Sequence, residues 1–206
     1  MNTGYKSYHT YQIKAMPHKI MLCFVRSDSD ILEASWLNRA AASLASTEDG
    51  SAPFIHAELL FCPPGGSSGK DSVSGLACSI VYSGNVHLET KRFSRKEWFF
   101  RSMEVSKGQY DTMMSFCKVH QGDSFNHLGY FMYWSPLRPS PMFYTYLGMT
   151  PRWYCSEIVI GALKAGEIVD ESVSSSMHPH ELYKLMQGSS VADCARDINA
   201  LNLRFV

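Results

Sequence analysis

The sequence predicts an α+β domain in which an antiparallel sheet carries helices on one side. Three observations lead to this class. A helical pattern is followed by several strand patterns and then by further helices, and Ser83-Gly84-Asn85 marks a hairpin between two of the strands. An apolar content of 45% in 206 residues is enough to fill one core. We therefore expect a single domain over 1–206, with its core at about 18–187 and extensions at 1–17 and 188–206.

The first half of the chain supplies two buried strands with a helix between them. Residues 19–26 and 54–61 have strand patterns, 30–45 has a helical pattern, and 46–53 is rich in loop residues. In FIHAELLF, alternation places Phe54, His56, Glu58 and Leu60 on one face and Ile55, Ala57, Leu59 and Phe61 on the other. The second face is wholly apolar, so we expect it to meet the core.

The remaining elements follow from turn and capping signals. Gly, Ser and Pro predict a flexible loop at 62–75, and the hairpin strands should cover 76–82 and 86–93, with a further strand at 97–105. Ser106 and Gln109 form a capping-box pair before a helix at 107–121. Prolines exclude a long element from the aromatic stretch 125–153. A helix is expected at 155–165, ended by Gly166, and a short one after Pro179.

Charge and composition exclude several classes of protein. The net charge is zero, so no broad attraction to nucleic acid or to an anionic membrane is implied, and no nucleic-acid partner is expected. No apolar run reaches the roughly 18–20 residues of a transmembrane segment, and the polar N-terminus is not a secretory signal. The cysteines lack C-x-x-C spacing, so we expect free thiols, no metal and no cofactor, in a cytoplasmic protein. They are Cys23, Cys62, Cys78, Cys117, Cys155 and Cys194.

Cys155 is the strongest candidate for chemistry. It opens the helix pattern in WYCSEIVIGAL, where unpaired backbone N–H groups and the helix dipole favour the thiolate. His56 lies on a predicted strand and offers a base, and Glu58 shares its face and could orient the ring. His87, in the neighbouring hairpin, is an alternative third residue. Tyr154, together with the backbone N–H of Cys155, is a candidate for stabilising an oxyanion.

Each of these residues also has a purely structural interpretation. A cysteine at a helix start is more often structural than catalytic, and a histidine on an apolar strand is usually a half-buried side chain with ordinary partners. Glu58 could equally face solvent or form a salt bridge. Glu157 could simply complement the helix dipole.

The two segments FIHAELLF and WYCSEIVIGAL resemble the circularly permuted branch of the NlpC-type papain-like cysteine hydrolases. That branch includes YiiX-like bacterial proteins, relatives of lecithin–retinol acyltransferase, and members encoded by large DNA viruses such as poxviruses. The shared features are a strand with H-x-E, an aromatic-Cys-Ser-Glu run opening a helix, and the order His56 before Cys155. The segment SMHPHELYKLM is similar to one that follows the cysteine helix in many relatives.

The resemblance implies a permuted papain-like fold in which the cysteine at a helix N-terminus faces the strand histidine. It also implies a cysteine-dependent hydrolase (a thiol protease or other peptidase, or an amidase) or an acyltransferase that works through an acyl-thioester. The substrate would be a peptide, an amide or a lipid ester, and a viral member would act in the host cytoplasm. The third catalytic residue varies in this superfamily, and the oligomeric state stays open.

The aromatic stretch before Cys155 is the candidate substrate-binding region. Tyr133, Trp134 and Trp153 could line an apolar pocket there, although aromatic residues more often pack in a core. Two other functions were weighed. One is a binding or effector protein that carries a vestigial site on the same fold. The other is metal binding by His178 and His180 with His120, His127 or a cysteine, but their spacing fits no strong zinc pattern.

Overall fold

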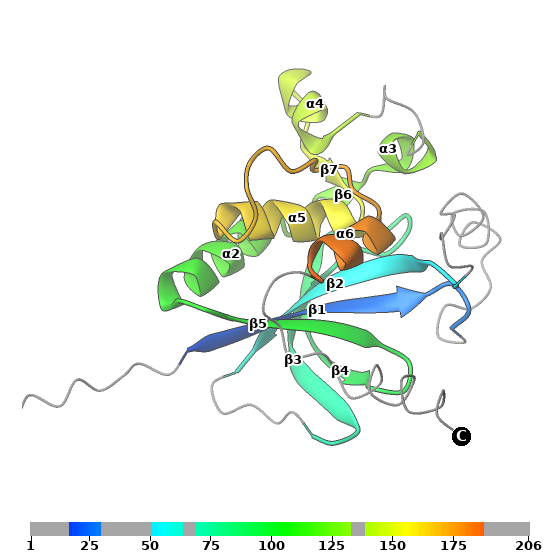
Figure 1. Cartoon of the computed structure of the whole chain (residues 1–206). Coiled ribbons are helices and arrows are strands. Elements are labelled where there is room, and N and C mark those ends of the chain that lie inside the picture. Colours follow the sequence, from blue (N-terminus) through cyan, green and yellow to red (C-terminus); the bar gives the residue numbers. More distant parts are fainter. Residues whose placement is uncertain (1–16, 30–50, 64–68, 133–138, 188–206) are drawn as a thin grey trace, which may run out of the picture.

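A computed structural model describes residues 17–29, 51–63, 69–132 and 139–187. Its centre is a five-stranded antiparallel sheet in the order β4-β3-β2-β1-β5 (Figure 1). The strands are β1 (His18–Arg26), β2 (Phe54–Cys62), β3 (Ser72–Ser79), β4 (His87–Ser94) and β5 (Phe99–Val105). The predicted α+β class and antiparallel sheet are therefore confirmed. The helix predicted at 30–45 lies outside the described residues.

Helices α2 (Lys107–Val119), α5 (Cys155–Ala165) and α6 (Pro179–Leu185) pack on one face of this sheet (Figure 1). The capping box of α2 forms as predicted: the Gln109 backbone N–H donates to Ser106 Oγ at 3.2 Å, and the Ser106 N–H donates to Gln109 Oε1 at 3.0 Å. Helix α5 begins and ends where the sequence predicted. Within the part of the chain that the structure describes, no helix has both the length and the apolarity to cross a bilayer.

The aromatic stretch contains only short elements, as its prolines predicted. They are α3 (His127–Phe131), α4 (Pro141–Tyr146), and the strands β6 (Ser124–Phe125) and β7 (Arg152–Trp153), which pair in parallel. This pairing brings the chain back beside β6 immediately before α5 begins.

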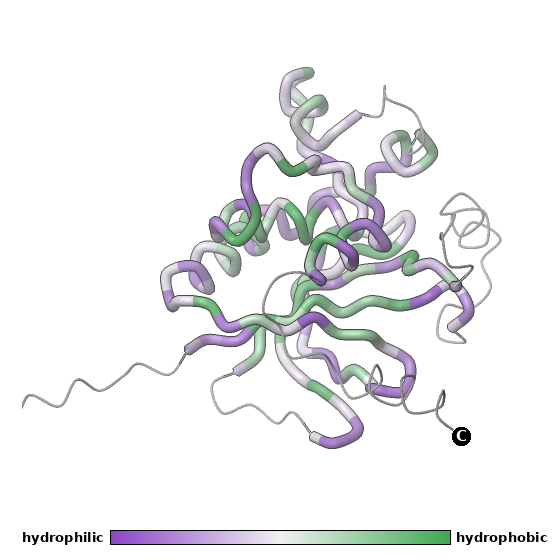
Figure 2. Tube along the Cα trace, in the orientation of Figure 1, coloured by the Kyte–Doolittle hydropathy of each residue, from purple (hydrophilic) through white to green (hydrophobic). Residues whose placement is uncertain are grey.

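The central strands are apolar on both faces, as Figure 2 shows by their colour. The helix side of β2 presents Ala57, Leu59 and Phe61 to the main core, as predicted. The opposite side holds a smaller cluster built from Met21, Cys23, Leu60, Cys62, Val73, Ala77, Phe93 and Phe100. The prediction for Phe54 was wrong, because it packs with the main core. The register between β1 and β2 shifts at Val25 and Arg26, which moves Phe54 to the other face.

Strand β3 begins earlier than predicted, because Ser72–Gly75 belong to the strand instead of the flexible loop expected at 62–75. Gly75 is needed there: a Cβ at this position would lie 2.4 Å from the Phe61 carbonyl oxygen. The strand then ends at Ser79, and residues 80–86 form the turn, with the Gly84 N–H donating to the Val81 carbonyl at 2.9 Å. The turn leaves Val81 and Tyr82 exposed.

Helix α5 carries two glycines that let α2 approach it closely. A Cβ on Gly161 would lie 2.6 Å from the Phe116 ring, and one on Gly166 would lie 2.6 Å from the Met113 side chain. Gly166 ends the helix as predicted, but it does not take the left-handed conformation. That conformation falls on Glu167, at φ 55°, and the Ile168 N–H closes the turn on the Leu163 carbonyl at 2.8 Å.

Candidate active site

Cys155 is the first residue of α5, and a buried carboxylate fixes the backbone around it. Glu157 Oε2 accepts from the Tyr154 backbone N–H and from the Asn126 side-chain amide, both at 3.1 Å, and its Oε1 accepts from Ser176 Oγ at 3.2 Å. Its side chain is fully buried. Glu157 therefore does more than complement the helix dipole, because it joins the start of α5 to the segments before α3 and α6.

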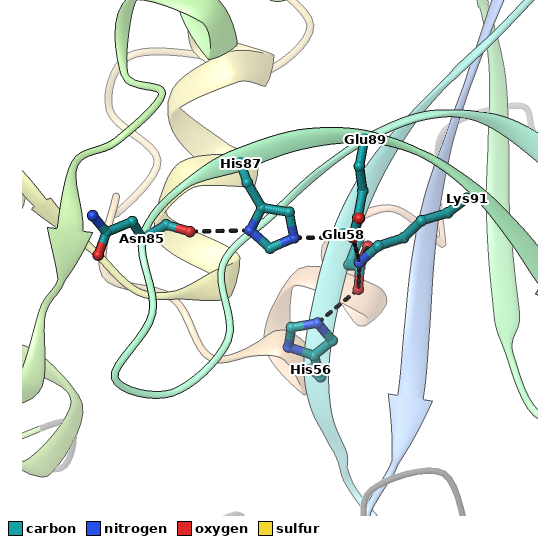
Figure 3. Close-up of polar contacts among 6 residues, drawn as sticks. All are labelled: His56, Glu58, Asn85, His87, Glu89 and Lys91. Carbon is teal, nitrogen blue, oxygen red and sulfur yellow. Dashed lines mark hydrogen bonds and ion pairs between the residues drawn. The ribbon is translucent and has the colours of Figure 1, made fainter.

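His56 and Glu58 lie two residues apart on β2 and contact each other as the alternation predicts. His56 Nε2 is 3.1 Å from Glu58 Oε1 (Figure 3), and the two side chains are only 12% and 4% exposed. This contact occupies Nε2 and leaves Nδ1 as the ring nitrogen for any other partner. The Trp98 ring, which sequence reasoning missed, meets the His56 ring edge-on at 6.1 Å between centroids.

The pKa of the His56 imidazole is affected by the Cys155 side chain. Burial lowers the pKa of this ring, but hydrogen bonding with the Cys155 and Glu58 side chains, together with their negative charges, outweighs that effect and raises the pKa to about 10. This pKa favours an imidazolium beside the Glu58 carboxylate at neutral pH.

Lys91 completes the site, and sequence reasoning missed it. From β4 its ammonium reaches both carboxylate oxygens of Glu58, at 3.1 and 3.2 Å, and lies 3.0 Å from Glu89 (Figure 3). Burial raises the pKa of Glu58, yet His56 and Lys91 lower it overall. Lys91 is paired in register with Gly75, so no side chain on β3 stands at that position. The signal in the sequence was the alternation of His87, Glu89 and Lys91, which puts their side chains on one face of β4.

His87 does not contact His56. Its Nδ1 is 3.0 Å from the Asn85 carbonyl, and its Nε2 is 3.1 Å from Glu89 Oε1 (Figure 3). It therefore joins the His56–Glu58 pair only through Glu89 and Lys91. Of the two candidates for a third residue, Glu58 is the one in direct contact with the His56 ring.

The other predicted site residues have different surroundings. Tyr133 and Trp134 lie outside the described residues. Trp153 is a core residue, with its indole N–H donating to Asp123 at 2.9 Å and its ring packed between His120 and Phe116. Tyr154 is the buried N-cap residue of α5, next to Cys155.

Tyr130, one of the aromatic residues in the stretch before Cys155, is a neighbour of the thiol. Burial raises the pKa of its hydroxyl, and the negative charges of Cys155 and Tyr82 raise it further. Its ring lies 6.5 Å from that of Tyr154, between centroids. Helix α3 therefore borders the start of α5.

The other described cysteines are buried in the core. Burial raises the pKa of Cys23 and of Cys62, and a hydrogen bond with Cys78 together with burial raises that of Cys117. The thiols of Cys23, Cys62 and Cys117 therefore stay protonated at neutral pH. Cys194 lies outside the described residues.

The histidines considered for metal binding have other partners. His178 caps α6 and accepts from the His180 backbone N–H at 3.2 Å, while His120 pairs with Asp123 at 2.8 Å. His127 packs its ring against Tyr82 and Phe125. Among residues 17–29, 51–63, 69–132 and 139–187, no three His, Cys, Asp or Glu side chains form a group that could hold a metal ion.

Comparisons of the chain with protein families, curated proteins and solved structures found no match. The chemistry of Cys155, His56, Glu58 and Lys91 is therefore the basis for assigning a function.

Proposed function

We propose that the protein is a cysteine-dependent hydrolase or acyltransferase on a permuted papain-like fold. Cys155 is the nucleophile, His56 the acid–base group and Glu58 the residue that orients the ring. The observation that carries the proposal is the buried His56–Glu58 pair, whose imidazole has a pKa raised to about 10 with the Cys155 and Glu58 side chains among the causes, together with the place of Cys155 at a helix start. This is the arrangement that nucleophilic thiol catalysis requires.

The reaction follows from these roles. The Cys155 thiolate attacks the carbonyl carbon of an ester or amide and forms a tetrahedral oxyanion. The Cys155 backbone N–H, which has no intrahelical partner at this position, points its dipole at that oxyanion. His56 then gives its proton to the leaving alcohol or amine as the C–O or C–N bond breaks. Water or an acceptor hydroxyl, deprotonated by His56, attacks the thioester and releases the acyl group and the thiolate.

Lys91 acts in this scheme as a positioning residue. A carboxylate as buried as that of Glu58 would otherwise favour its protonated form and release the imidazole ring. The ammonium contacts both oxygens, which keeps Glu58 ionised and fixes its plane. Nε2 of His56 is thereby held on Glu58, and Nδ1 stays available for the thiol.

The test is the rate at which a thiol-directed electrophile modifies Cys155 at neutral pH, followed by peptide mapping. We expect Cys155 to react much faster than the buried cysteines. His56→Ala should slow the reaction at least about tenfold, because the thiolate loses its cationic partner. His87→Ala is the matched control, since His87 lies on β4, which β3 separates from β2, and its ring nitrogens pair with Asn85 and Glu89.

Two outcomes would end the catalytic proposal. One is a Cys155 that reacts no faster than an ordinary exposed thiol. The other is an equal effect of His56→Ala and His87→Ala. Either outcome would favour the alternative function, a binding or effector protein with a vestigial site.

A further inference from the structure

One end of the molecule carries most of its exposed apolar side chains. We call it the aromatic end, and it consists of the turn at 80–86 together with α3, α4 and the residues that follow α4. Of ten large hydrophobic residues exposed in the described chain, eight lie here, and Val119 and Leu185 are the exceptions. The eight are Val81, Tyr82, Leu128, Phe131, Phe143, Tyr146, Leu147 and Met149. So large a share at one end marks an interaction surface, because exposed apolar residues are otherwise scattered singly.

The parts of the aromatic end are held together by specific contacts. The Tyr82 ring packs against those of Tyr130 and Phe131, at 5.8 and 6.4 Å between centroids. The buried Asn126 side chain accepts from the Gly129 N–H and from the Tyr144 hydroxyl, both at 2.8 Å, and so joins α3 to α4. The exposed side chains are therefore carried on a prearranged scaffold, and Figure 1 shows α3 and α4 in the upper part of the view, beyond α5 from β5.

The charge of these segments points to the chemistry of the partner. Residues 80–86 and 124–156 contain no aspartate or glutamate, although the chain has 19 of them. Their charged residues are Arg138, outside the described residues, and Arg152, whose guanidinium lies over the Tyr144 ring at 5.4 Å. A surface that combines apolar and aromatic side chains with arginine and excludes carboxylates is complementary to anionic headgroups over an apolar layer.

The shape of the aromatic end favours a bilayer over a protein partner. Its most exposed residue is Tyr146, at 88%, near the end of α4, and the apolar residues lie on two short helices and a turn instead of in a groove. A fluid membrane can accommodate such separate projections, whereas a folded partner would need a matching set of hollows.

We propose that the aromatic end docks on the surface of an anionic phospholipid bilayer, with Phe131, Tyr146 and Leu147 entering the headgroup region and Arg152 facing the lipid phosphates. Tyr130 of α3 lies near Cys155, so docking holds the start of α5 close to the membrane surface. The docking itself does not depend on thiol chemistry, and it holds whether or not Cys155 is catalytic.

The test is co-sedimentation of the full chain with vesicles of phosphatidylcholine alone or with added phosphatidylserine. We use the Cys155→Ala protein so that no reaction with lipid contributes. We expect binding to the vesicles that contain phosphatidylserine, reduced at least about tenfold by Phe131→Gln with Leu147→Gln, since each loses the burial of a large apolar side chain. Arg152→Gln should weaken binding to these vesicles alone. Val119→Gln with Leu185→Gln is the matched control and should bind as the parent does.

Three results would overturn the proposal. The parent could fail to bind either vesicle, the control pair could lose as much binding as the Phe131 and Leu147 pair, or phosphatidylserine could make no difference. Sedimentation velocity without vesicles identifies the competing occupant. A dimer dispersed by Phe131→Gln with Leu147→Gln, without vesicle binding, would assign the surface to a second copy of the chain.

Discussion

Replacing Lys91 with methionine removes the cation that contacts both oxygens of Glu58, at 3.1 and 3.2 Å. Taking one partner from a fully buried ion pair costs about 3–5 kcal/mol. The cost here should be lower, because the Lys91 side chain is 24% exposed and Glu58 keeps its contact with His56. We expect the free energy of unfolding at pH 7 to fall by about 2 kcal/mol, which corresponds to a melting temperature roughly 4–8 °C lower.

The pH dependence of this loss has a definite sign. The pKa of Glu58 is lowered in the folded protein, so its stabilising contribution is present above its ordinary value of 4.5 and disappears as the pH falls through the folded value. The pKa of Lys91 is raised, so its contribution is fully present below its ordinary value of 10.5 and is lost as the pH rises through the folded value. The difference between wild type and Lys91→Met should therefore be greatest at neutral pH and shrink in acid.

The assay is equilibrium urea unfolding, with Glu89→Gln as the matched control. Glu89 is the other carboxylate that contacts Lys91, but its side chain is 51% exposed, so its loss should cost clearly less than the loss of Lys91. The Lys91→Met protein should also alkylate more slowly at Cys155, whereas Lys164→Met, at a half-buried lysine away from the site, should not. Equal stability losses for Lys91→Met and Glu89→Gln, with an unchanged alkylation rate, would refute the role given to Lys91.

Three further predictions concern α5, its end and His56. Gly161→Ala should destabilise the protein by about 1–3 kcal/mol, because the new methyl group would meet the Phe116 ring, whereas Gly108→Ala on open α2 surface should not destabilise it. Glu167→Gly should stabilise by about 0.5–1 kcal/mol, since glycine adopts φ 55° without strain. The pKa of His56 is raised from 6.5 to about 10, so its contribution, measured against His56→Gln, should be complete below pH 6.5 and lost as pH rises through about 10.

Urea unfolding measures all three, and each can fail separately. Equal effects of alanine at Gly161 and Gly108 would contradict the close approach of α2 and α5. A Glu167→Gly protein less stable than wild type would show that this side chain contributes more than its backbone strain costs. A difference between wild type and His56→Gln that does not change between pH 6.5 and 10 would show that the imidazolium is not specifically stabilised.

Local patterns carried most of what the sequence predicted about the fold. The alternation in FIHAELLF placed His56 beside Glu58, a capping box located the start of α2 and an apolar helical pattern located the start of α5, because these features depend on residues close together in the chain. Phe54 and Gly75 were misjudged for the opposite reason. The face taken by Phe54 depends on the register shift between β1 and β2, and the need for glycine at position 75 depends on the close approach of the Phe61 carbonyl in β2. Both features involve residues from another strand.

The same distinction applies to the site. Sequence reasoning found His56 and Glu58 because they share a face at a separation of two residues. It missed Lys91 and Trp98, which reach the site through the pairing of β4 and the turn before β5. A lysine on a strand is commonly solvent-exposed, and only the order of the strands reveals that this one extends to a buried carboxylate.

The most direct test of the central claim is to trap the acyl-enzyme. The protein is incubated with an activated acyl ester, quenched in acid, and the acylated peptide identified by mass spectrometry. We predict one thioester on Cys155, absent from Cys155→Ala and formed much more slowly by His56→Ala than by His87→Ala. Acylation spread over other residues, or proceeding equally fast without His56, would contradict the assignment of Cys155 and His56 as a nucleophile and its base.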